Sequence, residues 1–181
     1  QQDVLLCGRG DQGVLGTDSM KVVVIGGGVA GFNAAQIAVG MKGNVTILEM
    51  NDERITFLKD YFGESATVVK STPEALDELL PEADMVIGAV LIPGASAPKL
   101  VTRDHLKIMK PKAMLVDIAI DQGGCFETSR PTTHTDPIYE ESGILHYCVA
   151  NMPGGVPRTS TLALNKATLP FLTKLADKGY E

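Results

Sequence analysis

Three glycines at a fixed spacing stand between two apolar runs near the start of this chain. The stretch "VVVIGGGVAGFNAAQIAVGMKGNVTILEM", residues 22–50, places Gly26, Gly28 and Gly31 in the pattern G-x-G-x-x-G. In this pattern the first glycine permits a tight turn out of a strand, the second lets the backbone approach a pyrophosphate, and the third lets a helix pack closely on a sheet. The helix N-terminus then offers N–H groups to the phosphates.

An acid closes the second apolar run and supports the same interpretation. Glu49 lies 18 residues after Gly31, at the end of a predicted strand. An acid there accepts hydrogen bonds from both ribose hydroxyls and repels a 2′-phosphate, so it favours NAD over NADP. Arg54 leaves an alternative open, because a nearby cation would tolerate the extra phosphate. Glycines that serve only a tight turn are the competing explanation, which the strand before them and the helix after them disfavour.

Two further apolar runs are followed by polar residues that suit catalysis. Asp121 comes just after the run at 113–120 and is followed by two glycines, and Asn151 comes just after the run at 143–150. A carboxylate at the end of a strand, beside glycines that allow close approach, is well placed for proton transfer, although an aspartate that caps a turn is the simpler alternative. A loop rich in Gly, Ala and Pro, residues 88–102, leaves the fourth predicted strand where a cofactor would sit.

Short apolar runs alternate with helical patterns from Lys21 onward. Strands are predicted at 21–26, 44–49, 66–70, 84–91, 113–120 and 143–150, and helices at 30–42, 52–63, 72–83, 103–110 and 158–179. Thr72 is the expected N-cap of the third helix, with Pro73 at its first position, and Pro170 is expected to break or kink the last helix. Strands that are apolar on both faces indicate a doubly wound parallel α/β sheet, the Rossmann fold, with a ligand crevice where the strand order reverses.

Composition excludes several classes of function. The 181 residues carry a net charge of −6 without a basic block, which disfavours nucleic acid as a partner. No apolar run approaches the roughly 18 residues that span a membrane, and no signal peptide is visible. Three cysteines in no regular spacing favour free thiols in a reducing, cytoplasmic setting. No metal site is expected, because His105, His134 and His146 share no spacing with cysteines or acids; His105 is expected at the surface and His146 in the core.

Four stretches together resemble one family. They are "VVVIGGGVAGFNAAQIAVGM", "ADMVIGAVLIPGASAPKLVT", "LVDIAIDQGGCFETSRPTTH" and "HYCVANMPGGVPRTSTLALNKATLP". They are similar to the NAD-binding domain of L-alanine dehydrogenase over about residues 21–179, and "DQGGCFE" and "CVANMPG" are far more specific than the glycine pattern. The NAD-binding component of proton-translocating transhydrogenase shares the fold and the "VIGAVLIPG"-like loop, and resembles the last two stretches less well.

The resemblance implies an activity and roles for particular residues. The family converts L-alanine to pyruvate and ammonia with NAD as hydride acceptor, and is typically a homohexamer. Carried over by position, Asp121 is the catalytic aspartate and Asn151 an active-site asparagine. Glu49 stands where the family's ribose-binding acid is usually Asp. The remaining positions implied to contact the cofactor are Gly26, Gly28, Val29, Gly31, Arg54, Ser71, Val90, Leu100, Ile118, Val149 and Met152.

The same resemblance implies that part of the enzyme is not in this chain. The family holds its substrate with a second domain that supplies an arginine, a lysine and a histidine, and the present sequence shows only residues 1–20 before the nucleotide-binding pattern. We therefore expect residues 1–20 to be a leader or interdomain segment and residues 21–181 to be a nucleotide-binding domain whose alanine or pyruvate is held by the missing domain. A non-catalytic NAD-binding module, as in transhydrogenase or a redox sensor, is the alternative.

Overall fold

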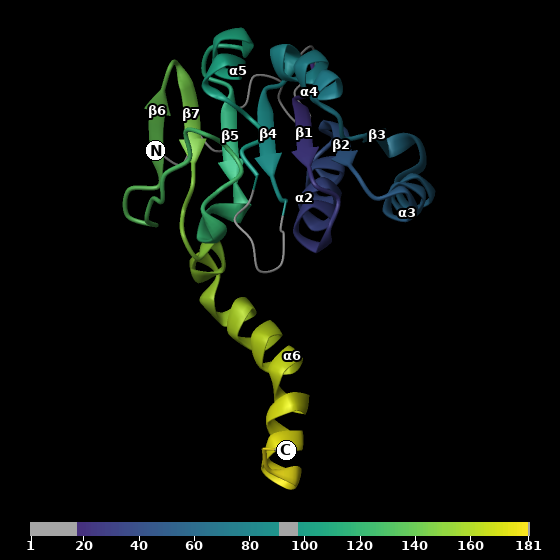
Figure 1. The fold of residues 1–181 in the computed structure, drawn as a ribbon, viewed down its shortest axis with the longest axis vertical. Coiled ribbons are helices and arrows are strands. Elements are labelled where there is room, and N and C mark those ends of the chain that lie inside the picture. The colour runs from purple at the N-terminus through teal and green to yellow at the C-terminus, as the bar shows by residue number, and fades with distance from the viewer. Residues whose placement is uncertain (1–17, 91–97, 181) are drawn as a thin grey trace. The chain divides into compact units, whose positions relative to one another are not determined.

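A seven-stranded sheet forms the centre of the computed structural model, which describes residues 18–90 and 98–180 (Figure 1). The strands lie in the order β3-β2-β1-β4-β5-β7-β6. Their bounds are β1 Lys21–Ile25, β2 Asn44–Glu49, β3 Ala66–Lys70, β4 Met85–Gly88, β5 Met114–Asp117, β6 Ile138–Glu141 and β7 Ile144–Tyr147. The predictions for residues 1–17, Cys7 among them, and for the loop at 91–97 lie outside the described residues.

The parallel pairing predicted from the apolar runs is confirmed. β1 pairs in parallel with β2 on one side and with β4 on the other, so that Val22 is opposite Val45 and Met85. The parallel pairs β2–β3, β4–β5 and β5–β7 extend the sheet in both directions. The strand order reverses between β1 and β4, which is the place where a doubly wound sheet leaves a crevice at the carboxyl ends of its strands.

Helices cover both faces of the sheet and bury two apolar clusters. On one face α2 (Val29–Gly40) and α3 (Asp52–Phe62) pack around Val24, Ile47 and Leu58. On the other face α4 (Pro73–Leu79) and α5 (Arg103–Ile108) supply Leu76 and Leu106. Short 3₁₀ turns complete the order of elements: η1 Gly63–Ser65, η2 Leu80–Glu82, η3 Ile118–Gln122 and η4 Met152–Gly155. Alternate residues of the central strands β1 and β2 enter opposite clusters, which is why these strands read as continuous apolar runs.

Local signals at the helix ends agree with the structure. The Thr72 side chain accepts a hydrogen bond from the Ala75 N–H at 3.2 Å, and Pro73 occupies the first position of α4, as predicted. His146 is fully buried, also as predicted, with Nε2 at 2.7 Å from the Thr128 hydroxyl. His105 differs from the prediction: its side chain is only 19% exposed, because Nε2 lies 3.0 Å from Asp77 and Nδ1 accepts the Thr102 N–H. It joins α5 to α4.

The strands predicted at 84–91, 113–120 and 143–150 are shorter in the structure, where β4, β5 and β7 end at Gly88, Asp117 and Tyr147, and one strand was missed. The predicted strand at 113–120 ends at Asp117, and residues 118–122 form η3. The chain turns there because the buried Asp117 carboxylate draws the later backbone at Cys125 toward it, with an N–H to oxygen distance of 2.9 Å. The antiparallel edge strand β6 was not predicted, since "IYEE" has no continuous apolar run. It pairs with β7 through a hairpin turn at Ser142 and Gly143, both with positive φ.

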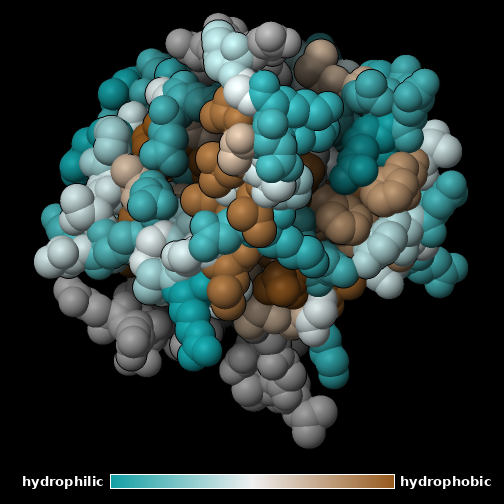
Figure 2. Space-filling model, turned by 90° about the horizontal axis from the view of Figure 1, so that it is seen from below, coloured by the Kyte–Doolittle hydropathy of each residue, from teal (hydrophilic) through white to brown (hydrophobic). Residues whose placement is uncertain are grey.

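A second compact unit begins at Asn151 and consists of η4 and the helix α6, Pro157–Lys178. Pro170 lies inside α6, and the helix continues past it, so the predicted break does not occur, while the alternative of a kink stays a prediction. The side chains of α6 include exposed apolar residues, among them Leu162, Leu169 and Phe171. Figure 2, which views the molecule from below, shows hydrophobic side chains exposed among hydrophilic ones.

No helix in the described part of the chain combines the length and apolarity that a membrane crossing requires.

Candidate functional site

A hollow of about 650 Å³ lies at the carboxyl ends of β1 and β4, where the strand order reverses. Its size is in the usual range for small-molecule and cofactor sites. Its walls combine backbone of the glycine loop with apolar side chains and one acid. The lining residues are Ile25, Gly26, Gly28, Val29, Ala30, Asn33, Leu48, Glu49, Met50, Ser71, Ala89, Val90, Pro98 and Leu100.

Two glycines of the loop have no room for a side chain. Gly26 has φ +97°, and a Cβ there would lie 2.8 Å from the Ala89 carbonyl oxygen. At Gly31 a Cβ would lie 1.8 Å from the carbonyl oxygen of Gly26, far inside van der Waals contact. Gly31 is buried and is not among the lining residues of the hollow; it lets α2 approach the end of β1. The loop keeps its shape because these two positions lack side chains.

The N-terminus of α2 is left open toward an anion. The first backbone hydrogen bond runs from the Phe32 N–H to the Gly28 carbonyl at 2.8 Å, so the preceding amides have no partner within the helix. No side chain caps this end, whereas Asn51 caps α3 by accepting the Arg54 N–H at 2.8 Å. A Cβ on Gly28 would meet nothing within 4 Å. Uncapped amides, the positive end of the helix dipole and open space together fit a phosphate group.

Glu49 is held by three backbone amides at the edge of the hollow. One carboxylate oxygen accepts the Gly27 N–H at 2.8 Å. The other accepts the N–H groups of Met50 at 2.7 Å and Asn51 at 2.9 Å. These bonds fix the Glu49 side chain of β2 against the glycine loop after β1. The oxygen that accepts the Gly27 N–H keeps one further lone pair for a ligand hydroxyl, whereas the other oxygen already accepts two amides. The Glu49 carboxylate is therefore preorganised by hydrogen bonds from the protein itself.

Arg54 takes part in the architecture of the loop. Its Nε donates to the Gly27 carbonyl at 2.7 Å, and its guanidinium lies 4.4 Å from the ring centroid of Phe57 and 5.4 Å from that of Phe32. Arg54 is not among the lining residues of the hollow. Glu49 and Arg54 therefore bind the N–H and the carbonyl of the same residue, Gly27, and so hold the two peptide groups on either side of its Cα.

The remaining predicted contact positions divide by location. Ser71, Val90 and Leu100 line the hollow. Ile118 packs, partly buried, against the cluster under α2 and α3. Val149 is fully buried and forms a bridge with Thr132. Gly26, Gly28, Val29 and Glu49 line the hollow as well, so seven of the predicted cofactor positions lie along it. They come from the ends of β1, β2, β3 and β4 and the segments that follow these strands.

The two predicted catalytic residues lie in different units. Asp121 is exposed in the 3₁₀ turn η3, directly after β5. Asn151 opens the second unit with φ 54° and ψ 54°, a left-handed conformation that asparagine adopts more readily than most residues. Its carbonyl accepts the Gly154 N–H at 2.8 Å, which begins the turn η4. Met152 is half-buried in that turn.

A buried aspartate organises the chain that follows η3. Asp117 is fully buried at the end of β5 and accepts the backbone N–H of Cys125 at 2.9 Å, with the hydroxyl of Ser129 as a further donor. Gly88 makes room for this return, since a Cβ there would lie 2.1 Å from the Cys125 sulfur. We did not single out Asp117 from the sequence, although an acid inside the apolar run "LVDIAI" was a usable signal. Its role is to fold the loop back onto β4.

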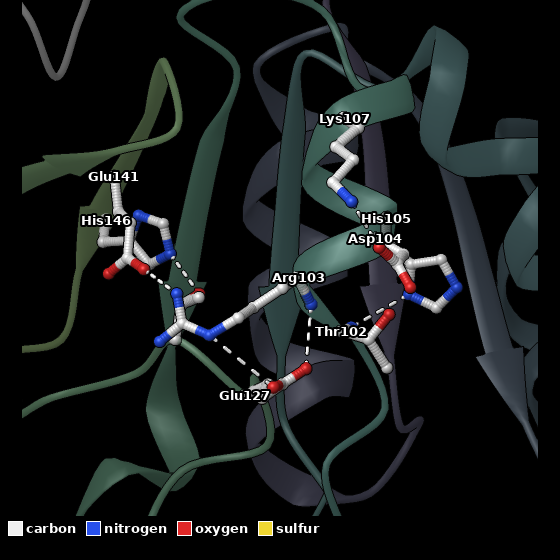
Figure 3. Close-up of polar contacts among 9 residues, drawn as sticks. Thr102, Arg103, Asp104, His105, Lys107, Glu127, Glu141 and His146 are labelled. Atoms are coloured by element: carbon white, nitrogen blue, oxygen red, sulfur yellow. Dashed lines mark hydrogen bonds and ion pairs between the residues drawn. The ribbon is translucent and has the colours of Figure 1, made fainter.

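Ion pairs join the same loop to α5 and β6. Glu127 accepts the backbone N–H of Arg103 at 2.9 Å, and the Arg103 side chain reaches both Glu127 and Glu141 (Figure 3). A backbone hydrogen bond from the Glu127 N–H to the Val101 carbonyl, 2.8 Å, runs beside them. The segment at Val101 and Arg103 is therefore linked to the segment at Glu127 by backbone hydrogen bonds and an ion pair.

The thiols near this loop are poor nucleophiles. Cys125 and Cys148 are free and fully buried. Burial raises the pKa of both thiols, and the neighbouring Asp117 carboxylate raises that of Cys125 further. The neutral thiol is the unreactive form. Within the described residues no group of three or more His, Cys, Asp or Glu is arranged to hold a metal ion.

Comparison with known proteins identifies the family. The family described as "Alanine dehydrogenase/PNT, C-terminal domain" matches residues 8–181. The chain belongs to this family. It is 57% identical to the alanine dehydrogenase of Halomonas elongata over 169 residues, which are 93% of this chain and 46% of that protein. Among solved structures, an L-alanine dehydrogenase superposes with a TM-score of 0.88 at 46% identity, covering 96% of this chain and 47% of that one.

A transhydrogenase is a more distant member of the same fold. The transhydrogenase from Sinorhizobium meliloti matches with a TM-score of 0.79 at 27% identity, covering 93% of this chain and 49% of that one. The chain thus spans about half the length of the relatives that it matches. It corresponds to the C-terminal, NAD-binding domain of the alanine dehydrogenase/PNT family, and its cofactor is NAD.

Proposed function

We propose that this chain is the cofactor-binding part of an alanine dehydrogenase, which converts L-alanine, NAD⁺ and water to pyruvate, ammonium, NADH and a proton. The observation that carries the proposal is the glycine loop between β1 and α2, fastened to Glu49 at the point where the strand order reverses. The 57% identity to an alanine dehydrogenase supports the choice of substrate. Fold alone would not support it, since this fold serves many reactions.

The residues of the hollow suit the parts of a dinucleotide. The uncapped amides at the start of α2 would bind the pyrophosphate, and Gly28 lets it approach the backbone. Glu49 would accept hydrogen bonds from the adenosine ribose hydroxyls. Its negative charge would repel a 2′-phosphate, while Arg54 is engaged by Gly27 and two aromatic rings. We therefore propose a preference for NAD over NADP.

Asp121 and Asn151 are the proposed catalytic residues. NAD held by the glycine loop and Glu49 would supply the hydride acceptor for Cα of alanine, and the oxidised substrate would carry a cationic iminium group. A carboxylate at Asp121 would stabilise that cation and take a proton from the water that adds to it, giving a carbinolamine and then pyruvate and ammonium. Asn151 would orient substrate by hydrogen bonds from its amide. The exposed position of Asp121 in η3 leaves it accessible to a substrate.

The longer relatives set the context of the proposal. Because the chain spans about half of their length, we propose that residues outside this chain hold the carboxylate of alanine and supply the partner for Asp121. The cytoplasmic location and the homohexameric assembly expected from the resemblance are part of the same proposal. The 181-residue chain should bind NAD and should not turn over alanine by itself.

Calorimetry and a turnover assay test the proposal. Titration of the chain with NAD and with NADP should show that NAD binds with at least about tenfold higher affinity. A difference of this size is expected when one hydrogen bond to the charged Glu49 carboxylate is lost. Absence of NAD binding, or a tenfold preference for NADP, would contradict it. Robust NADH formation by this chain from alanine and NAD would contradict the assignment of the substrate site to residues outside it.

A non-catalytic NAD-binding module is the second candidate function. The likeness to the transhydrogenase from Sinorhizobium meliloti favours it, at 27% identity against 57% for the alanine dehydrogenase. The two candidates differ at Asp121. In a longer protein that carries this domain, Asp121→Asn should abolish alanine-dependent NADH formation while leaving NAD affinity within about threefold, because the residue acts on the substrate. A binding module would have no such activity to lose.

A further inference from the structure

The turn that carries Asp121 is held from outside by one lysine. Lys99 donates from its ammonium group to the carbonyl oxygens of Gly123, at 2.5 Å, and Gly124, at 2.7 Å. These residues directly follow η3, and the bonds cross 24 and 25 positions of sequence. The ammonium group has three donors on one nitrogen, so it can bind two adjacent carbonyls at once.

Two backbone amides of this turn are bonded within the turn itself. The Gly123 N–H donates to the Ile120 carbonyl and the Gly124 N–H to the Ala119 carbonyl, both at 3.0 Å. Both glycines have positive φ, 89° and 73°, which brings their peptide groups into this arrangement. The N–H groups of Gly123 and Gly124 are thus bonded within the turn, and their carbonyl oxygens are bonded to Lys99.

Lys99 stands in a segment that also forms the wall of the hollow. Its two neighbours, Pro98 and Leu100, line the hollow. The Leu100 N–H donates to the Cys125 carbonyl at 2.8 Å, and Val101 forms a parallel bridge with Phe126. The wall of the hollow and the Asp121 turn are therefore joined by backbone bonds at one end and by the lysine at the other.

We propose that Lys99 is a positioning residue: it ties the turn that carries Asp121 to the wall of the cofactor hollow. The proposal rests on the proposed function for its catalytic meaning. A cofactor in contact with Pro98 and Leu100 would restrict the motion of Lys99 between them. Lys99 would in turn restrict the motion of Gly123 and Gly124, whose carbonyls it binds. The lysine also brings a positive charge to the segment that carries the carboxylate. It is exposed, which fits a group that acts on a neighbouring turn and is not needed for the core.

Amide NMR of the whole 181-residue chain tests the tether. Lys99→Met should shift the amide signals of Gly123 and Gly124 and speed their hydrogen exchange by about tenfold or more, the effect of losing one or two charged hydrogen bonds. Lys99→Arg should restore slow exchange, since the guanidinium keeps the charge and several donors. Lys107→Met is the matched control, because Lys107 is an exposed lysine paired with Asp104 on α5. Unchanged exchange in Lys99→Met would overturn the proposal.

Coupling to the cofactor is read in the same samples. NAD added to the wild-type chain should shift the Gly123 and Gly124 signals, and this response should be lost in Lys99→Met while NAD affinity changes by less than about threefold. An equal response in both proteins would overturn the coupling. Failure of the wild-type chain to bind NAD would overturn the proposed function alone, because the exchange comparison without NAD still reads the tether. In a longer enzyme, Lys99→Met should lower kcat about tenfold with little change in KM for NAD.

Discussion

The carboxylate of Glu49 accepts the backbone N–H of Gly27 at 2.8 Å, so the acid at the end of β2 fixes the glycine loop at the end of β1. Two more amides, of Met50 and Asn51, hold the other carboxylate oxygen. One side chain therefore shapes the phosphate-binding loop and also stands ready for a ribose. The charge of Glu49 is the property that should separate NAD from NADP.

Glu49→Gln should reduce this discrimination. The amide oxygen can still accept one backbone N–H, but the negative charge is lost, so NAD affinity should fall by about tenfold or more, the equivalent of about 1.5 to 3 kcal/mol for a hydrogen bond to a charged group. NADP affinity should fall less, because the repulsion of a 2′-phosphate is also removed. Calorimetric titration with both dinucleotides measures the ratio. Glu64→Gln, an exposed acid in η1, is the control and should leave the ratio unchanged. A ratio that survives in Glu49→Gln would contradict the role of the charge.

Gly31→Ala should disrupt the loop without changing any polar group. The new Cβ would lie 1.8 Å from the Gly26 carbonyl oxygen, so α2 must move away from β1. We expect a loss of about 1 to 3 kcal/mol in the free energy of unfolding, as for other overpacked sites, together with weaker NAD binding. Urea denaturation and calorimetry measure the two effects. Gly40→Ala, in the same helix with open space around the position, should instead stabilise the chain by up to about 1 kcal/mol. Equal behaviour of the two variants would contradict the close-packing argument.

Asp117→Ala should destabilise the chain by about 3 kcal/mol, because it leaves buried amides without an acceptor. The Cys125 N–H loses its acceptor in a fully buried site, and the half-buried Ser129 hydroxyl loses its partner as well. Asp117→Asn keeps one acceptor and should cost less. Urea denaturation gives the values, with Asp60→Ala on the exposed face of α3 as a control expected to lie within about 0.5 kcal/mol of the wild type. A loss below 1 kcal/mol in Asp117→Ala would show that the loop does not depend on this carboxylate.

His146 should make the stability depend on pH. Burial lowers the pKa of His146 below its ordinary value of 6.5 in the folded chain. Near and below pH 6.5 the imidazole is therefore protonated more readily in the unfolded chain than in the folded chain. The free energy of unfolding keeps its full value above pH 6.5 and falls as the pH drops below that value. Each unit of pKa difference contributes about 1.4 kcal/mol. Urea denaturation at pH 8, 6.5 and 5 should show a steeper fall for the wild type than for His146→Gln.

Measurements at pH 8 separate packing from titration. There the imidazole is neutral in both states, so any difference between wild type and His146→Gln reports the lost contacts with Thr128 and Tyr139. Curves that run parallel from pH 8 to pH 5 would contradict a role for the imidazole in the pH dependence.

Several features followed from the sequence because neighbouring residues carry the signal. The parallel strands were predicted from apolar runs, since a strand buried on both faces needs apolar side chains at every position. Gly26 and Gly31 were predicted because a positive φ and a close helix approach require the absence of a side chain at those positions. Thr72 and Pro73 marked the start of α4 for similarly local reasons. β6 was missed because an edge strand at the surface needs no apolar run.

Short stretches of sequence were enough to predict the doubly wound sheet, the glycine loop and the acid at the end of β2, because their signals come from residues close together in the chain. The contacts of Arg54 with Gly27, of Asp117 with Cys125 and of Lys99 with Gly123 became apparent in the folded chain alone. The first and last of these contacts join residues that lie 27 and 24 positions apart. Their partners are set by how the sheet brings the carboxyl ends of its strands to one edge, and no local spacing encodes that meeting.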